Sequence, residues 1–261
     1  MSLLKGKRAL VCGSSQGIGR AIARKFAESG AEVVLLARDR VALNAVLSQL
    51  QQADGRRHSF IAADFADPDS LKQRLAERLP DIGPIHILIN NTGGPPGGAI
   101  QSAKTDEFLD AFSKHLLCNQ ILTQAVLEGM KRAAFGRIIN IISISVREPL
   151  AGLGVSNTVR GAVASWSKTL AGELAAFGIT VNNILPGYTE TTRLTSIIER
   201  KARELNKSFD QIADELKKSI PLGRFANPEE IANAAQFLAS DLAAYITGVN
   251  LPVDGGRLSC L

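Results

Sequence analysis

Three glycines near the start of the chain have the spacing of a loop that holds phosphate groups. Gly13, Gly17 and Gly19 follow an apolar run and lead into a segment with helical periodicity. The first glycine permits a sharp turn, the second lets the backbone approach a diphosphate, and the third lets the helix pack closely on the strand. The free N–H groups of the helix start then receive the negative charge. The sequence predicts a dinucleotide site formed by Gly13, Ser14, Ser15, Gln16, Gly17, Ile18 and Gly19.

The residue that follows the second apolar run indicates which dinucleotide is preferred. An acidic side chain there would accept hydrogen bonds from the adenine ribose and favour NAD. This chain has Arg38 instead, and a guanidinium can pair with the extra 2′-phosphate of NADP. Because Asp39 lies next to it, NAD(H) remains a second option. We expect NADP(H) to be the preferred cofactor.

Short apolar runs of strand length alternate along the chain with segments of helical spacing. Parallel strands need crossover connections, and strands buried on both faces read as continuous apolar runs. The pattern therefore predicts one α/β domain, a doubly wound (Rossmann) sheet of seven parallel strands with helices on both faces. The expected strands are residues 8–12, 32–37, 59–63, 85–89, 137–142, 180–185 and 249–253.

Residues 192–221 interrupt this rhythm between the sixth and seventh expected strands. The segment is rich in charged residues and has apolar residues at helical spacing: Leu205, Phe209, Ile212 and Leu216. One interpretation is a solvated pair of surface helices. The other is a lid over a substrate site, because lids are drawn from regions of low local stability. The sequence leaves both open.

The bulk composition is that of an ordinary globular protein. With 261 residues, 45% hydrophobic and 21% charged, the chain can bury a large core as one domain. Its net charge of +5 comes from scattered lysines and arginines, which argues against nucleic acid and fits an anionic small ligand. Three cysteines without CxxC spacing indicate neither a disulfide framework nor a metal site. No signal peptide or membrane span is evident, and we expect a cytoplasmic protein.

Segments along nearly the whole length resemble the short-chain dehydrogenase/reductase family. Besides the glycine loop, Asp64 resembles the family's adenine-contacting aspartate. Residues 90–93 resemble its segment after the fourth strand, and residues 186–191 resemble its loop that holds the nicotinamide carboxamide. The resemblance adds to the cofactor-binding set Asp64, Phe65, Asn91, Thr92, Gly93, Pro186, Gly187, Thr189 and Thr191. Residues 228–232, 237–240, 245–248 and 254–256 resemble its 3-oxoacyl-(acyl carrier protein) reductase-like branch.

The family's chemistry, interconversion of a carbonyl and an alcohol, uses a serine and a Tyr-x-x-x-Lys pair, and this chain departs from that set. A phenol has a pKa near 10, so a nearby cation must lower it before it exchanges protons near neutral pH. Here Ser143 stands at the serine position, but Ser156 and Arg160 stand at the tyrosine and lysine positions. Arg160 keeps the helical spacing and is expected to hold the nicotinamide ribose. A serine hydroxyl is too weak an acid to replace the phenol.

The group that donates the proton is therefore open. His115 stands where the family often has an asparagine, with Asn119 one turn further along, and Tyr188 follows Pro186 and Gly187. The chain is either a reductase with a rebuilt proton donor, such as His115 or Tyr188, a weakly active NADP-binding protein, or a structural subunit. Loss of a proton donor slows such a reaction without forbidding it. We expect a small carbonyl or alcohol substrate, and the resemblance implies a homo-oligomer, a tetramer or dimer.

Overall fold

One parallel sheet organises the molecule. The computed structural model describes residues 2–54 and 56–260, excepting the side chains of residues 51–54. Within these residues, seven strands pair in the order β3-β2-β1-β4-β5-β6-β7, every pair parallel, which confirms the predicted fold. The strands are β1 (Arg8–Cys12), β2 (Glu32–Ala37), β3 (Ser59–Ala62), β4 (Ile87–Asn90), β5 (Gly136–Ile141), β6 (Ile179–Pro186) and β7 (Asn250–Val253).

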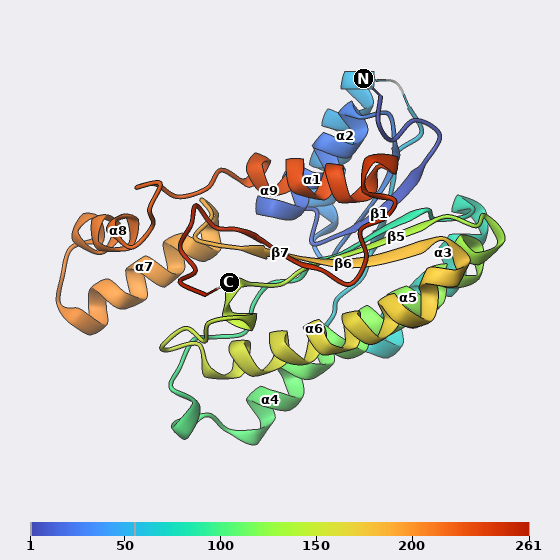
Figure 1. The fold of residues 1–261 in the computed structure, drawn as a ribbon. Helices are drawn as coiled ribbons and strands as arrows, with labels where there is room; N and C mark the ends of the chain where they lie inside the picture. Colours follow the sequence, from blue (N-terminus) through green and yellow to red (C-terminus); the bar gives the residue numbers. More distant parts are fainter. Residues whose placement is uncertain (1, 55, 261) are drawn as a thin grey trace.

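Helices cover both faces of the sheet (Figure 1). On one face lie α1 (Gly17–Glu28), α2 (Arg40–Asp54) and α9 (Pro228–Ala239). On the other lie α3 (Pro68–Ile82), α4 (Thr105–Phe112), α5 (Cys118–Arg132) and α6 (Gly154–Leu174). The helices α7 (Thr192–Leu205) and α8 (Phe209–Lys218) project beyond the carboxyl end of β6. No helix of the described residues is long and apolar enough to cross a bilayer.

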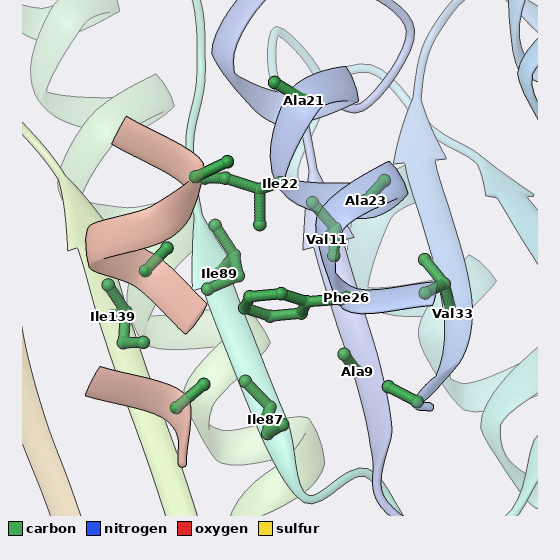
Figure 2. Close-up of a cluster of buried hydrophobic side chains, with 14 of the residues drawn as sticks. Ala9, Val11, Ala21, Ile22, Ala23, Phe26, Val33, Ile87, Ile89 and Ile139 are labelled. Atoms are coloured by element: carbon green, nitrogen blue, oxygen red, sulfur yellow. The ribbon is translucent and has the colours of Figure 1, made fainter. Parts of the chain in front are cut away.

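The apolar faces read from the sequence form the core. Phe26 of α1 is fully buried beside Val11 of β1 and Ile89 of β4 (Figure 2). A second cluster fills the opposite face, under α3 and α5. Because the five inner strands are buried on both faces, their apolar runs stand out, and the strands were located to within two residues at each end. The remaining differences lie at strand ends, where pairing stops.

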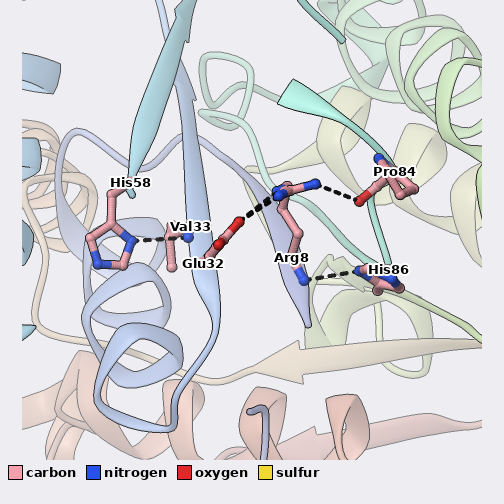
Figure 3. A network of polar contacts seen from close by, with 6 residues as sticks. All are labelled: Arg8, Glu32, Val33, His58, Pro84 and His86. Carbon is pink, nitrogen blue, oxygen red and sulfur yellow. Dashed lines mark hydrogen bonds and ion pairs between the residues drawn. The ribbon is translucent and has the colours of Figure 1, made fainter. Parts of the chain in front are cut away.

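A polar network ties the amino-terminal ends of β1 and β2 (Figure 3). The Arg8 guanidinium donates to Glu32 Oε2 at 2.6 and 2.9 Å, and the Arg8 backbone N–H donates to His86 Nδ1 at 3.0 Å. The Val33 N–H donates in the same way to His58 Nδ1 at 3.0 Å. Burial and the neighbouring Lys7 and Arg8 charges lower the pKa of His86, which suits an imidazole that accepts a hydrogen bond.

Four asparagines form a hydrogen-bonded row across the other half of the sheet. Asn90, Asn140, Asn183 and Asn250 face one another in the register of β4, β5, β6 and β7. Each amide nitrogen donates to the next side-chain oxygen, from Asn90 to Asn140, to Asn183 and to Asn250, always at 2.8 Å. Asn140 is completely buried. The row fixes the relative positions of the strands whose carboxyl ends carry the loops described below.

The helices α7 and α8 form a small apolar cluster of their own. Leu194 and Ile198 of α7 are buried with Ile212 and Leu216 of α8. Of the four apolar residues at helical spacing, Ile212 and Leu216 lie in this cluster, whereas Leu205 and Phe209 are 56% and 41% exposed. These two residues flank the turn between the helices, where the left-handed Asn206 ends α7 and changes the helical phase.

Candidate active site

A cleft of about 550 Å³ opens at the carboxyl ends of the central strands. The chain order of the strands reverses between β1 and β4, and open α/β sheets bind ligands at such a switch point. Nearly all the residues predicted for the site lie in this one cleft. These are Gly13, Ser15, Gln16, Gly17, Ile18, Arg38, Asp64, Phe65, Asn91, Thr92, Gly93, His115, Ser143, Ser156, Arg160, Pro186, Gly187, Thr189 and Thr191.

The glycine loop has the geometry that a diphosphate needs. Gly13 and Gly17 have φ values of +61° and +54°, which glycine adopts without strain. A Cβ on Gly13 would lie 2.8 Å from the Asn91 carbonyl oxygen, so a side chain would push the loop out of place. The first turn of α1 has no side-chain cap and no acidic residue. Its backbone N–H groups are available to an anion, and the loop fits the diphosphate of NADP(H).

Two residues of the predicted glycine loop support its shape without lining the cleft. Ser14 is completely buried, and its Oγ accepts a hydrogen bond from the Leu36 N–H at 3.0 Å. This contact ties the loop to β2. Gly19 packs against the Gly13 carbonyl, so a Cβ there would overlap the loop backbone. Neither residue lines the cleft; both hold the loop in the shape that faces the cofactor.

The adenine end of the cleft favours a 2′-phosphate. Arg38 is exposed at the cleft wall and forms no ion pair within the described residues. The carboxylate of Asp39 is already engaged, because its Oδ1 accepts from the backbone N–H groups of Val41 and Ala42, both at 3.0 Å. Asp39 therefore caps α2 and leaves the cleft to Arg38. The arrangement fits NADP(H) better than NAD(H).

Ser143, Ser156 and Arg160 meet at the other end of the cleft. Ser143 follows β5, and its Oγ accepts from the Ser145 N–H at 3.1 Å. Ser156 and Arg160 lie one turn apart on α6, and Arg160 Nε donates to Ser156 Oγ at 3.1 Å. Arg160 Nη1 also donates to the Ile142 carbonyl at 2.6 Å, which fixes the guanidinium at the end of β5. The spacing read from the sequence thus forms a direct contact.

The charge on Arg160 persists at neutral pH. Burial, followed by repulsion from Arg193, lowers its pKa from the ordinary value of an arginine to about 10. That value is still well above neutrality, so the guanidinium stays a cation. Because Ser156 Oγ accepts from this cation, the hydroxyl proton of Ser156 is free to point into the cleft and donate to a substrate oxygen.

His115 lies in a π-helical turn, residues Ser113–Leu117, between α4 and α5. Such turns occur often at functional sites. The imidazole is 5% exposed, and its Nε2 has no hydrogen-bond partner within the described part of the chain. Burial, then the charge of Arg160, lowers the pKa of His115 to about 3. His115 is therefore neutral near neutral pH, which weighs against it as the proton donor.

Tyr188, the other residue considered as a donor, packs within the substrate half of the cleft. Its ring contacts Phe225 edge to face, with centroids 6.1 Å apart. Its hydroxyl accepts from Arg257 Nη2 at 3.4 Å, and the Arg257 guanidinium lies 4.5 Å from the ring centre. These contacts hold the Tyr188 ring in the cleft wall, with its hydroxyl beside the Arg257 guanidinium.

Sequence reasoning missed three cations that line the cleft, Lys114, Arg193 and Arg257. Arg193 belongs to the first turn of α7, and its Nη2 donates to the Pro95 carbonyl at 2.7 Å. The sequence could have indicated Arg193, because it lies two residues after Thr191, a predicted cofactor-binding residue. Arg257 follows the turn formed by Gly255 and Gly256, and no motif distinguished it.

Comparison with known proteins decides the family. A model of the family described as enoyl-(acyl carrier protein) reductase matches residues 13–257. The chain belongs to this family of short-chain dehydrogenases/reductases. It is 36% identical over 253 residues to the 3-oxoacyl-[acyl-carrier-protein] reductase FabG of Vibrio harveyi, covering 97% of this chain and 98% of that one. The Escherichia coli FabG is 36% identical over 252 residues, 97% of each chain. The predicted 3-oxoacyl-(acyl carrier protein) reductase-like branch is confirmed.

Solved structures of similar fold support the same family assignment. L-sorbose reductase from Gluconobacter frateurii, described as a complex with NADPH and L-sorbose, has a TM-score of 0.93 and 32% identity and covers 100% of both chains. YwfH, described as an NADPH-dependent reductase of bacilysin biosynthesis, has a TM-score of 0.93 at 28% identity, covering 98% of this chain and 99% of its own. This short-chain dehydrogenase/reductase thus shares its fold with reductases along its full length.

Proposed function

We propose that this NADP(H)-dependent oxidoreductase interconverts a carbonyl and an alcohol in a site where Ser156 and Arg160 replace the tyrosine and lysine of its family. One observation carries the proposal: Arg160 Nε contacts Ser156 Oγ at 3.1 Å, in the same cleft as Ser143 and the glycine loop. The cofactor loop and a hydrogen-bonding, positively charged site thus lie at the two ends of one cavity.

The chain's own groups stabilise charge on the substrate oxygen. NADP(H), when bound, supplies or accepts the hydride. Ser143 and Ser156 donate hydrogen bonds to the carbonyl oxygen, and the fixed charge of Arg160 stabilises the negative charge that develops there. Neutral His115 and cationic Arg160 are weak acids at neutral pH, and the Tyr188 ring is fixed in the cleft wall by Phe225 and Arg257, so we assign the proton to water in the cleft. A positioned acid is typically worth a factor of about 10² to 10⁴, so we expect slow turnover.

The two non-catalytic alternatives, an NADP-binding module and a structural subunit, gain no support. The relatives and neighbours above are described as reductases, and Ser143, Ser156 and Arg160 line the same cleft as the glycine loop. The loss of the phenol changes the source of the proton. It leaves hydride transfer and oxyanion stabilisation in place.

The helix pair of residues 192–221 serves as the lid in this proposal. Thr192, Arg193, Leu194 and Ile197, all in the first half of α7, line the cleft. The pair also has an apolar cluster separate from the main core. Both observations support the lid interpretation over a solvated surface pair.

A homo-oligomer remains part of the proposal. Leu109 and Phe112 of α4 and Leu117 before α5 are exposed apolar side chains, the kind that a partner subunit covers. Trp166 of α6 donates from Nε1 to Gln120 Oε1 of α5 at 2.8 Å, which joins these two neighbouring helices. Size-exclusion chromatography with light scattering should give the mass of a dimer or tetramer. A monomer at all concentrations would contradict the proposed homo-oligomer. The cytoplasmic location stays a prediction.

The enzymatic proposal is tested by NADPH oxidation, followed by its absorbance, with a panel of carbonyl compounds. Arg160→Gln should lower kcat/KM by about 10² to 10³, because one charged oxyanion stabiliser is lost. Ser156→Ala should lower kcat by about tenfold, from the loss of one neutral donor. Ser165→Ala, an exposed serine on the same helix, is the matched control and should leave both constants unchanged.

The double variant Ser156→Tyr with Arg160→Lys restores the family pair and should raise kcat. Tight NADPH binding by the wild-type protein without turnover of any carbonyl would instead favour the binding module. Turnover that is indifferent to both Arg160→Gln and Ser156→Ala would place the chemistry elsewhere in the cleft.

A further inference from the structure

The substrate half of the cleft contains positive charge that the protein itself does not neutralise. Arg160, Arg193 and Arg257 line it. Within the described residues, none of the three forms an ion pair with a carboxylate. The contacts of these guanidinium groups are with neutral oxygens: the Ser156 hydroxyl and Ile142 carbonyl for Arg160, the Pro95 carbonyl for Arg193, and the Tyr188 hydroxyl for Arg257.

The first two guanidinium groups converge on one point. A Cβ built on Gly94 would lie 3.2 Å from Arg160 Nη2 and 3.4 Å from Arg193 Nη2. The two nitrogens are therefore closer together than the sum of these distances. Because Gly94 has no side chain, the space between them stays open to the cleft. Arg160 Nη2 donates to no acceptor within the described residues, so it is available to a ligand.

The electrostatics of this cluster are those of repelling cations. The charge of Arg193 lowers the pKa of Arg160, and the charge of Arg200, behind Arg193 on α7, lowers the pKa of Arg193. For both arginines burial is the larger cause. Partly buried like charges without a counter-charge destabilise a fold. An anion bound between them would relieve this repulsion.

The acidic residues of the cleft do not provide the counter-charge. Asp110 pairs with Lys114 at 2.6 Å. The Oδ1 of Asp64 accepts from the Ala66 N–H at 3.0 Å at the adenine end. Arg200 does have a partner, Glu204 at 3.8 Å, but that carboxylate is 61% exposed and does not line the cleft. The missing negative charge must therefore come from a ligand.

We infer that the substrate carries a carboxylate, which binds between Arg160 and Arg193 beside the reacting carbonyl. The inference rests on the proposed function, since it names the substrate class of that same site. Arg160 contacts Ser156, the residue at the proton-donor position, so the anion lies within a few bonds of the carbonyl. The substrate class is a short oxo acid and its hydroxy acid. Guanidinium groups bind planar carboxylates through paired N–H donors, which suits this geometry.

The diphosphate of the cofactor occupies a different place in the cleft. Its predicted binding site is the glycine loop and the uncapped start of α1. Thr191, not Arg193, lies against Gly17 of that loop, with its Cγ2 3.2 Å from the Cβ position. Arg193 Nη2 donates instead to the Pro95 carbonyl, on the loop after β4.

The test measures anion binding separately from turnover. The protein saturated with NADP⁺ is titrated by calorimetry with acetate, succinate, inorganic phosphate and neutral acetamide. The carboxylates should bind and acetamide should not. Arg193→Gln should weaken carboxylate binding at least tenfold, and Arg193→Lys, which keeps the charge but loses the planar fork, should weaken it less. Arg203→Gln, an exposed arginine on the same helix, should change nothing.

Turnover supplies the second readout. A 2-oxo acid should have a kcat/KM at least a hundredfold above that of its methyl ester, and Arg193→Gln should narrow this ratio. Neutral carbonyls reduced as well as oxo acids would overturn the inference while keeping the proposed function. Carboxylate binding without turnover of any carbonyl would support the anion site but contradict the proposed function. The inference also fails if phosphate binds more tightly than carboxylate, or if Arg193→Gln weakens NADP⁺ binding instead.

Discussion

At the scale of single residues, His115 couples the stability of the cleft to pH. Its ordinary pKa is 6.5, and in the folded protein burial lowers the value to about 3. As the pH falls, the unfolded chain takes up a proton before the folded one does. The free energy of unfolding therefore decreases from about pH 6.5 downward, by roughly 1.4 kcal/mol per pH unit for this group.

Replacing His115 with asparagine removes this titration. Between about pH 7 and pH 5, the free energy of unfolding should fall by roughly 2 kcal/mol less for His115→Asn than for the wild type. Urea unfolding at both pH values measures the difference. His58 and His86 are present in both proteins, so their contributions cancel. Equal pH dependence in the two proteins would show that folding leaves the pKa of His115 unchanged.

The dependence of activity on pH should also reflect the neutral state of His115. With His115 neutral and Arg160 charged, kcat/KM should show no inflection near the ordinary histidine pKa. It should fall as the pH rises through about 10, where Arg160, whose pKa lies there, loses its charge. An inflection near 6.5 would return His115 to the role of proton donor.

The sequence predicted single residues well wherever backbone geometry or spacing limited the choice. Gly13 and Gly17 adopt positive φ, and the i, i+4 spacing of Ser156 and Arg160 becomes a hydrogen bond. Arg193 and Arg257 were missed because their direction depends on tertiary contacts, with Pro95 and Tyr188, that lie far away in the chain.

At the scale of elements, the asparagine row shows what strand prediction leaves out. The apolar runs located β4, β5 and β6, but Asn140 and Asn183 are buried polar residues inside them. Their partners lie on neighbouring strands, 43 to 67 residues away in the sequence, so no local pattern identifies the row. Only the register of the folded sheet aligns the four amides.

Removing the centre of the row should destabilise the sheet more than removing its end. Asn140→Ala leaves both the Asn90 amide and the Asn183 oxygen without partners, and each unsatisfied buried group costs about 1–3 kcal/mol. Asn250→Ala leaves one partner, Asn183, unsatisfied and should cost about half as much. Urea denaturation measures both.

The matched control for these variants is Asn233→Ala on α9, where the side chain is exposed. Its free energy of unfolding should change by less than about 0.5 kcal/mol. If Asn140→Ala cost no more than this control, water would be replacing the missing amide and the row would be dispensable.

At the scale of the whole molecule, the fold divides into a rigid sheet and a more weakly attached helix pair. The two main apolar clusters pack against the sheet, one on each face. The cluster of Leu194, Ile198, Ile212 and Leu216 is separate and small. Figure 1 shows α7 and α8 extending beyond the body of the sheet. A region with few buried apolar contacts opens at lower free energy than the core.

Amide hydrogen exchange should therefore separate the two parts. Without ligands, α7 and α8 should exchange faster than β4, β5 and β6. NADP⁺ with a carboxylate should slow exchange in the first half of α7, because Arg193 and Leu194 line the cleft. Ile198→Ala should lower the protection of both helices by about 2–4 kcal/mol and leave the sheet unchanged. Leu205→Ala, exposed on the same helix, is the control. If Ile198→Ala lowered protection in the sheet equally, α7 and α8 would unfold with the core, and residues 192–221 could not act as an independent lid.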